Sequence, residues 1–388
     1  MGVIQNMSSN QRSALLDLVR LFLRLGTVAF GGPAAHIAMF REEVVVRRKW
    51  LTEQRFLDLM GATNLIPGPN STEMAIHIGL ERAGWRGLIV AGACFILPAS
   101  IIVGALAWAY VEFQTVPALG WVTYGIKPVV VAIIFNALFG LGITALKTRW
   151  LMALGLAGLV LFLAGMNELA VLFGSGFLVA LFRTAGKLPL GGRGAVAFVP
   201  VLGFNAAAKA LAAVPGLEQI FLSFLKLGAV IYGSGYVLLP FMNNELVERL
   251  EWLTATQLLD AIAIGQITPG PVFTTATFVG YLLAGVPGAA VATVAIFLPS
   301  FAFVGILNPL VRKIRDLDWA AGFLDGVNAA AIALMAGAVI QLRSSAIIDW
   351  PTAIIAVASL VALRMKVNAT WLILGAAGFG VVVRLVFG

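Results

Sequence analysis

Long stretches without charge are the feature that most constrains this chain. Four segments of roughly 20 residues carry at most one charged side chain each, which is long enough to cross the hydrocarbon core of a bilayer. They are Leu88–Tyr110, Val129–Leu146, Val291–Leu310 and Trp371–Phe387. Charged residues make up 11% of the 388 residues and hydrophobic residues 60%, too few charges to cover the surface of a soluble protein. We therefore predict an all-α polytopic membrane protein.

The excess of Lys and Arg over Asp and Glu is typical of a membrane protein. The formal net charge is +8 at pH 7, and cytoplasmic loops of membrane proteins collect Lys and Arg. No nucleic-acid partner is therefore expected. A single cysteine, Cys94, excludes a disulfide framework and a cysteine metal site. The polar start of the chain predicts no signal peptide. The absence of a Walker-type loop disfavours ATP hydrolysis, and no cofactor is expected.

The sequence repeats itself at an offset of 202 residues (22 to 224, 67 to 269), which becomes 201 further along. The matching windows are "FLRLGTVAFGGP" (Phe22–Pro33) with "FLKLGAVIYGSG" (Phe224–Gly235), "KWLTEQRFLDLM" (Lys49–Met60) with "EWLTATQLLDAI" (Glu251–Ile262), and the Pro-Gly-Pro triplets at 67–69 and 269–271. We predict an N-terminal transporter repeat over 1–184, a linker over 185–215 and a C-terminal repeat over 216–388.

Loop charges predict that the two repeats are inverted. The first loop, 41–55, contains five basic residues, whereas its equivalent, 243–256, has three glutamates and one arginine. Three further loop pairs show the same opposition, and opposite loop bias places equivalent loops on opposite sides of the membrane. Each repeat is expected to have about five spanning helices plus one re-entrant, broken helical hairpin at Pro-Gly-Pro. The predicted spans are 14–32, 88–111, 121–146, 150–166, 168–183, 217–240, 288–310, 321–342, 351–363 and 369–387, with hairpins at 53–80 and 255–282.

Pro-Gly-Pro breaks a helix and starts another. The proline rings end the first helix, and the next helix presents unpaired N–H groups and a positive dipole end, which attract an anion. Broken helices within a membrane lie where they line a cavity or are buried in protein. Two copies favour a substrate-lining role over a packing kink. The predicted lining residues are Asn64, Gly68, Asn70, Ser71, Thr72, Gln266, Gly270, Thr274 and Thr275.

Two cations occupy equivalent positions in the first helix of each repeat. Arg24 lies about a dozen residues into an apolar segment, and its equivalent is Lys226. Ionisable groups at depth are costly and usually functional, so both are predicted to bind an anion; snorkelling to the interface or bonding to the broken backbone are the alternatives. Gly31 and Gly32, at the end of the first helix, either form the opposite wall of this site or make a turn.

Glu73 and His77 are four residues apart on one helical face just after the first break. They are predicted to relay a proton or to balance charge. Without a third ligand the pair does not predict a metal site. His36 is expected to be structural.

Other charges are expected at helix ends. Glu43 and Asp58 are predicted to pair with neighbouring arginines, although Asp58 and its equivalent Asp260 are alternatively pathway residues. Lys127, beside Pro128, is interpreted as a charge at the start of a span. Thr52 and Thr254 are predicted helix N-caps.

The segments "FGGPAAHIAMF", "WLTEQRFLDLMGATNLIPGPNSTEMAIHIG" and "QITPGPVFTTATFVGY" resemble the chromate ion transporter (CHR) family in its long, two-domain form. The resemblance implies efflux of chromate from the cytoplasm across the plasma membrane, driven by the membrane potential or proton gradient, which gives chromate resistance. Chromate is a tetrahedral dianion similar to sulfate, and it matches the anion site predicted from two cations and two helix termini.

The leading hypothesis is thus a multi-pass inner-membrane secondary transporter that exports chromate by alternating access. The alternatives are an importer or exchanger of sulfate or a related oxyanion, and an anion channel. A membrane enzyme is disfavoured. Expected partners are chromate or a related oxyanion and membrane lipid, and a homodimer remains open.

Overall fold

The computed structural model describes residues 9–30, 32–64, 66–113, 117–185, 215–231, 235–315 and 317–387. Throughout these residues the regular elements are helices. The first half contains α1 (Ser9–Val28), α2 (Gly32–Arg41), the π-helix η1 (Glu42–Arg47), α3 (Glu53–Thr63), α4 (Asn70–Glu112), α5 (Pro117–Ala145), α6 (Arg149–Leu163) and α7 (Glu168–Ala185).

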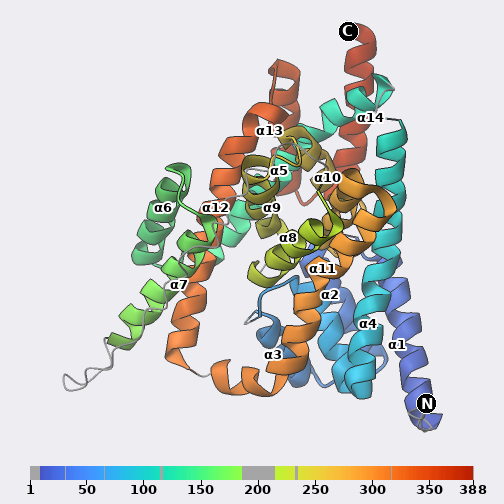
Figure 1. Ribbon diagram of the computed structural model, residues 1–388, viewed down its shortest axis with the longest axis vertical. Helices are drawn as coiled ribbons and strands as arrows, with labels where there is room; N and C mark the ends of the chain where they lie inside the picture. The colour runs from blue at the N-terminus through green and yellow to red at the C-terminus, as the bar shows by residue number, and fades with distance from the viewer. Residues whose placement is uncertain are drawn as a thin grey trace.

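The second half presents nearly the same order of elements (Figure 1). It contains α8 (Leu217–Val230), η2 (Gly235–Val237), α9 (Leu238–Met242), the π-helix η3 (Asn243–Arg249), α10 (Ala255–Ile267), η4 (Val272–Thr274), α11 (Thr275–Arg315), α12 (Asp318–Ala346), α13 (Trp350–Arg364) and α14 (Ala369–Phe387). Of the predicted linker, all but its first and last residues lie outside the described residues.

Five of the described helices are long and apolar enough to cross a membrane. Their apolar segments are Asn70–Glu112, Gly120–Ala145, Glu168–Ala185, Val272–Ile306 and Asp318–Ala346. Three shorter apolar helices accompany them: Arg149–Leu163, Trp350–Arg364 and Ala369–Val383. The predicted class, an all-helical multi-pass membrane protein, is confirmed.

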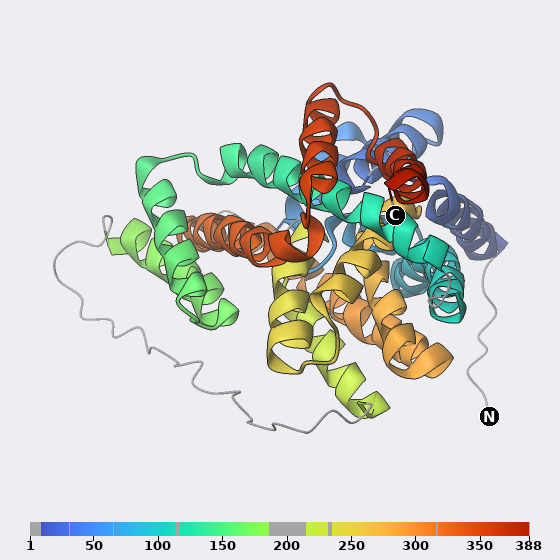
Figure 2. The same cartoon turned by 90° about the horizontal axis from the view of Figure 1, so that it is seen from above.

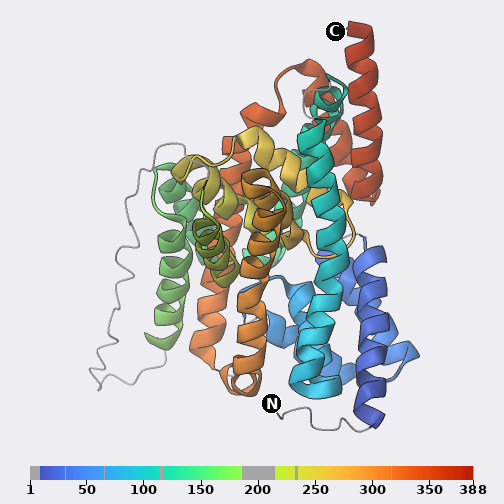
Figure 3. The same cartoon turned by 45° about the vertical axis from the view of Figure 1, so that its right-hand side comes forward.

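The longest helices, α4 and α11, each consist of two arms joined by a sharp turn. The backbone leaves helical geometry at Ala83 and Gly84 in α4, where φ of Gly84 is 61°, a region that glycine adopts readily. The arms pack closely because a side chain on Gly79 would overlap the carbonyl group of Gly87. The α11 turn, at Gly285, has the same construction. Figure 3 shows α4 folded back near its lower end.

The two halves exchange packing partners. Helices α4 and α11 pack against each other at the centre, with α1 along α4 and α8 along α11. Helix α5 of the first half packs against α13 and α14 of the second, whereas α12 of the second half packs against α6 and α7 of the first (Figure 2). In each half, the last two helices therefore pack on a long helix of the other half.

Both predicted helix caps are confirmed. The hydroxyl of Thr52 accepts the backbone N–H of Arg55 at 3.2 Å, and that of Thr254 accepts the N–H of Gln257 at 3.1 Å. Each satisfies one of the free donors at the start of α3 and α10.

Two predicted spans end earlier than expected. Helix α1 ends at Val28 rather than near residue 32, and α8 ends at Val230 rather than near 240. The physical reason is that the next carbonyl groups bond to the other half of the protein, as described below.

Candidate substrate site

Both Pro-Gly-Pro triplets interrupt the helices where they were predicted to. The first lies between the end of α3 and the start of α4, and the second between α10 and η4. The φ angles of Gly68 and Gly270 are +142° and +87°, a conformation that residues with a Cβ rarely adopt. The glycine of each triplet therefore allows the chain to reverse between two prolines.

The two breaks are bonded across the two halves in a reciprocal way. The Gly68 N–H donates to the carbonyl oxygen of Ile231, just past α8, at 2.6 Å. The Gly270 N–H donates to the carbonyl oxygen of Ala29, just past α1, at 2.9 Å. Both donors and both acceptors are 202 positions apart. Each break is thus anchored on the end of the first helix of the other half, which brings both breaks to the interface between the halves.

The start of α4 buries polar groups that have no partner. Ser71, Thr72, Glu73 and His77 are at most 2% exposed. Thr72 Oγ1 and both ring nitrogens of His77 lack a hydrogen-bond partner among the described residues. Because a buried polar group without a partner costs free energy, such a set is typical of a ligand site. These residues include the predicted proton pair.

The first break also touches the second half through α11. A Cβ on Gly68 would overlap both Glu73 Oε1 and Ser300 Oγ. The two side chains therefore converge on the space that this glycine leaves open. Ser300 is fully buried, and its hydroxyl faces the Glu73 carboxyl across this space.

The second break is less polar. The hydroxyls of Thr274 and Thr275 donate to the carbonyl oxygens of Pro271 and Val272, both at 2.8 Å. The hydroxyl hydrogens of these two predicted lining residues are therefore already bonded within their own turn. A Cβ on Gly270 would lie 2.6 Å from the Cβ of Ala99 in α4.

A small cavity lies beside this second break. Its lining includes Gln266, whose Nε2 has no partner, together with Thr275 and residues of α5 and α9. Its volume of about 10 Å³ is close to what one water molecule needs. A tetrahedral oxyanion does not fit in it in this conformation.

Two asparagines lie at the rim of the first break. Asn70 Nδ2 donates to Asn64 Oδ1 at 3.0 Å, and Asn64 is exposed. Gly32 opens α2 with a φ of 77°, whereas Gly31 lies outside the described residues.

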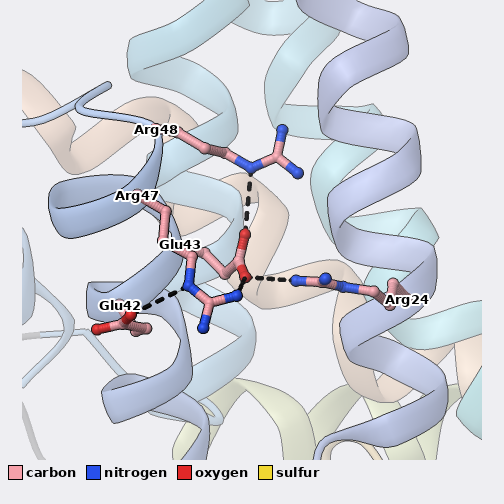
Figure 4. A network of polar contacts seen from close by, with 5 residues as sticks. All are labelled: Arg24, Glu42, Glu43, Arg47 and Arg48. Atoms are coloured by element: carbon pink, nitrogen blue, oxygen red, sulfur yellow. Dashed lines mark hydrogen bonds and ion pairs between the residues drawn. The ribbon is translucent and has the colours of Figure 1, made fainter.

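The predicted anion-binding cations are each paired with a glutamate. Arg24 Nη2 lies 2.5 Å from Glu43 Oε1, and Arg47 and Arg48 complete the set around Glu43 (Figure 4). In the other half, Lys226 Nζ lies 2.7 Å from Glu245 Oε2, which also pairs with Arg249. Glu43 therefore pairs with arginines, as predicted. The contacts found in the described residues join neither Arg24 nor Lys226 to the breaks.

Both glutamates are kept ionised by these partners. Burial raises the pKa of Glu43, but hydrogen bonds and charges from Arg24 and Arg48 outweigh it, so that the pKa lies below its ordinary value. The pKa of Glu245 is likewise lowered, since Arg249 and Lys226 outweigh its burial. The two cations are thus neutralised in this conformation.

His36 has a role that the sequence did not specify. Its Nε2 lies 3.0 Å from the carbonyl oxygen of Ala29, the same oxygen that accepts the Gly270 N–H. Because a carbonyl only accepts, Nε2 carries the proton. The buried ring thus orients the anchor of the second break, which agrees with a structural role.

Sequence reasoning missed a buried ion pair between the halves. Lys127 of α5 lies with its Nζ 3.7 Å from Asp260 Oδ1 in α10. Tyr110 of α4 donates to Asp260 Oδ2 at 2.8 Å. The available signal was a lysine inside an apolar run, but its partner is 133 positions away and only the fold reveals it.

Across the described residues there is no group of three or more His, Cys, Asp or Glu side chains that could hold a metal ion.

Comparison with known proteins gives one consistent family. The family described as chromate transporter matches this chain twice, over residues 16–180 and 218–381. The chromate transport protein of Cupriavidus metallidurans is 36% identical over 377 residues, covering 95% of this chain and 93% of that protein. The chromate transport protein of Pseudomonas aeruginosa is 33% identical over 84% of this chain and 80% of its own length. A probable chromate transport protein of Synechococcus elongatus is 32% identical, covering 90% and 89%. No solved structure matches.

Proposed function

The chain belongs to the chromate transporter family, and we propose that it is a secondary transporter that exports chromate across the inner membrane by alternating access. Export of this kind confers chromate resistance. Family membership indicates transport of chromate, and it implies transport rather than enzymatic catalysis.

The observation that carries this proposal is the reciprocal anchoring of the two breaks. Gly68 and Gly270 each bond to the other half, so a relative movement of the halves changes both breaks at once. The buried start of α4 offers backbone N–H groups and the unpaired Thr72 hydroxyl for an oxyanion. The cavity beside the second break is too small for such an anion in this conformation, and alternating access would admit the anion by moving the halves apart.

We propose that the halves, 1–184 and 216–388, are inverted in the membrane, with 185–215 as their linker. Three observations support this arrangement: the opposite loop charges, the repeated order of elements, and the family match in each half. The Pro-Gly-Pro segments then enter and leave the membrane on one side, each as a broken hairpin.

The cations and the proton pair have separate roles in this proposal. Arg24 and Lys226 exchange their glutamate partners for chromate as the site opens toward each side. Glu73 and His77 carry the coupled proton, and the Glu73 carboxyl lies against Ser300 of the opposite half. The lining is formed by Asn64, Asn70, Ser71, Thr72, Gln266, Thr274 and Thr275 around the two glycines.

Chromate uptake into inverted membrane vesicles tests the function directly. Vesicles with the protein are expected to accumulate chromate saturably, and an imposed proton gradient is expected to change the rate. Uptake equal to that of vesicles without the protein would refute the proposal. A current that does not saturate and does not respond to the proton gradient would indicate a channel. Stronger uptake of sulfate into right-side-out vesicles would indicate an importer.

A further inference from the structure

We infer that Lys127 binds the transported anion beside the second break, and that Asp260 holds it when no anion is bound. The ligand class is a tetrahedral oxyanion with two negative charges. This inference rests on the proposed function, because it assigns a further residue to the same transport site.

Asp260 is buried and Lys127 is half-buried, and the two side chains form a long ion pair. The Lys127 side chain is 14% exposed and that of Asp260 is 4% exposed. Their 3.7 Å separation is longer than a hydrogen bond, and Asp260 Oδ1 has no hydrogen-bond partner among the described residues. The ammonium group therefore has unused donors within an apolar part of the protein, where ionisable side chains are costly and usually functional.

Lys127 lies on the face of α5 that leads to the small cavity. Ile134, which lines that cavity, is seven residues further along the same helix. Seven residues make about two turns, or roughly 10 Å, so both side chains lie on one face. Asp260 is on α10, which contributes Ile262 and Gln266 to the same cavity. The cation thus lies about two helical turns along α5 from this cavity, on the face that leads to it, and its partner Asp260 is on the helix that carries the unpaired amide of Gln266.

Tyr110 allows the pair to open. It holds Asp260 Oδ2 through a 2.8 Å hydrogen bond, and its ring packs edge-on against Phe278 with 5.3 Å between ring centroids. When an anion draws Lys127 away, Asp260 keeps this bond, so its carboxylate is not left without a partner. Release of the anion restores the ion pair. Asp260 therefore competes with the substrate for one cation.

This pair joins the two halves, and the repeat does not duplicate it. The repeat equivalent of Lys127 is Asn328, which carries no charge. Arg24 and Lys226, in contrast, are equivalent positions and each has its own glutamate. A single central cation gives the second break the attraction for an anion that its own threonines lack.

The test separates an anion-binding role from a purely structural one. We would measure chromate binding to purified protein by equilibrium dialysis, and the KM of chromate uptake in inverted vesicles. Lys127→Met is expected to lower the chromate affinity and to raise the KM by at least about tenfold each, because one charged hydrogen bond is lost. Lys127→Arg is expected to keep the affinity and the KM within a few-fold of the wild type. Lys147→Met is the matched control, because Lys147 follows the same helix but is exposed.

The double variant Lys127→Met/Asp260→Asn makes the test independent of folding. It removes both charges, so it is expected to reach wild-type amounts in the membrane even if Lys127→Met alone does not. A structural ion pair would predict wild-type chromate affinity in this double variant; the inference predicts that affinity stays at least about tenfold weaker. Wild-type affinity there would overturn it. If the wild-type protein binds chromate but does not transport it, the proposed function is refuted, whereas the inference about Lys127 is not.

Discussion

Gly68 donates its backbone N–H to the carbonyl oxygen of Ile231 at 2.6 Å, and these two residues belong to different halves of the protein. The equivalent bond, from Gly270 to Ala29, runs in the other direction. Two main-chain bonds thus couple each interrupted helix to the first helix of the opposite half.

Gly68→Ala is expected to abolish chromate transport. A methyl group would overlap Glu73 and Ser300, and the φ of +142° adds strain of roughly 1–3 kcal/mol. Vesicle uptake and thermal unfolding in detergent measure the two effects. Gly140→Ala is the control, because no atom lies within 4 Å of its added Cβ and it is helical. Normal uptake by Gly68→Ala would show that the first break tolerates a side chain.

Arg24→Ala is expected to remove chromate resistance from cells while the amount of protein in the membrane stays unchanged. Its side chain is half exposed, so its loss does not empty the core, but it removes a cation proposed to meet the substrate. Lys226→Ala tests the equivalent position. Arg20→Ala, on the same helix, is the control, since Arg20 is exposed and its equivalent, Leu222, is uncharged. Resistance that persists in Arg24→Ala would remove this residue from the site.

Glu73→Gln is expected to leave chromate uptake insensitive to an imposed proton gradient. The amide has nearly the same shape as the carboxyl but cannot carry the coupled proton. The measurement is the ratio of uptake rates with and without the gradient. Glu112→Gln, at the exposed end of α4, serves as the control. A ratio equal to that of the wild type would assign coupling to another group.

Glu245→Gln is expected to destabilise the protein by roughly 2–4 kcal/mol at neutral pH, because it leaves Lys226 and Arg249 without their shared carboxylate. The pKa of Glu245 is lowered in the folded protein, so this stabilisation is present above about pH 4.5, its ordinary value, and disappears as the pH falls through the folded value. Thermal unfolding across this range measures it. Glu53→Gln, which breaks the exposed pair with Arg41, should have a much smaller effect, because solvent screens the charges of an exposed pair. If Glu245→Gln and Glu53→Gln changed stability equally, the stabilising role given to Glu245 would be wrong.

Stability is expected to fall as the pH drops from about 6.5 toward 4 because of His36. Burial lowers the pKa of His36 to about 4, against the opposing hydrogen bond to Ala29. The unfolded chain therefore binds a proton in this window that the folded protein excludes, on the order of 3 kcal/mol in total. Melting curves of His36→Gln should depend less on pH over this range. The difference between the two curves isolates His36 from the second histidine, His77, and identical slopes would rule out its contribution.

Local features of the fold were predictable because they depend on neighbouring residues. Pro-Gly-Pro stops a helix wherever it occurs, and Thr52 and Thr254 follow the same Trp-Leu pair and cap in the same way. The apolar runs indicated the membrane class for the same reason. The turn within α4 lies at a glycine between the predicted hairpin and the next predicted span.

The pairing of charges was harder to predict because it depends on how helices lie against one another. Glu43 was expected to bond nearby arginines, but its bond to Arg24 requires η1 to pack beside α1. Lys127 and Asp260 are much further apart in the sequence, and repeat symmetry does not relate them. The packing of α5 on α13 and α14, and of α12 on α6 and α7, was also not predictable from the sequence. An apolar helix surface does not specify which other apolar surface covers it.

The crossed main-chain bonds also set an order for biogenesis. As the ribosome releases the first half into the bilayer, the Gly68 amide has no acceptor from the unmade half and the Ala29 carbonyl has only its bond to His36. An unpaired backbone amide is costly in lipid. The early half must therefore wait in an incomplete form until Ile231 and Gly270 have been synthesised. The two breaks therefore reach their final structure only after the second half has entered the membrane.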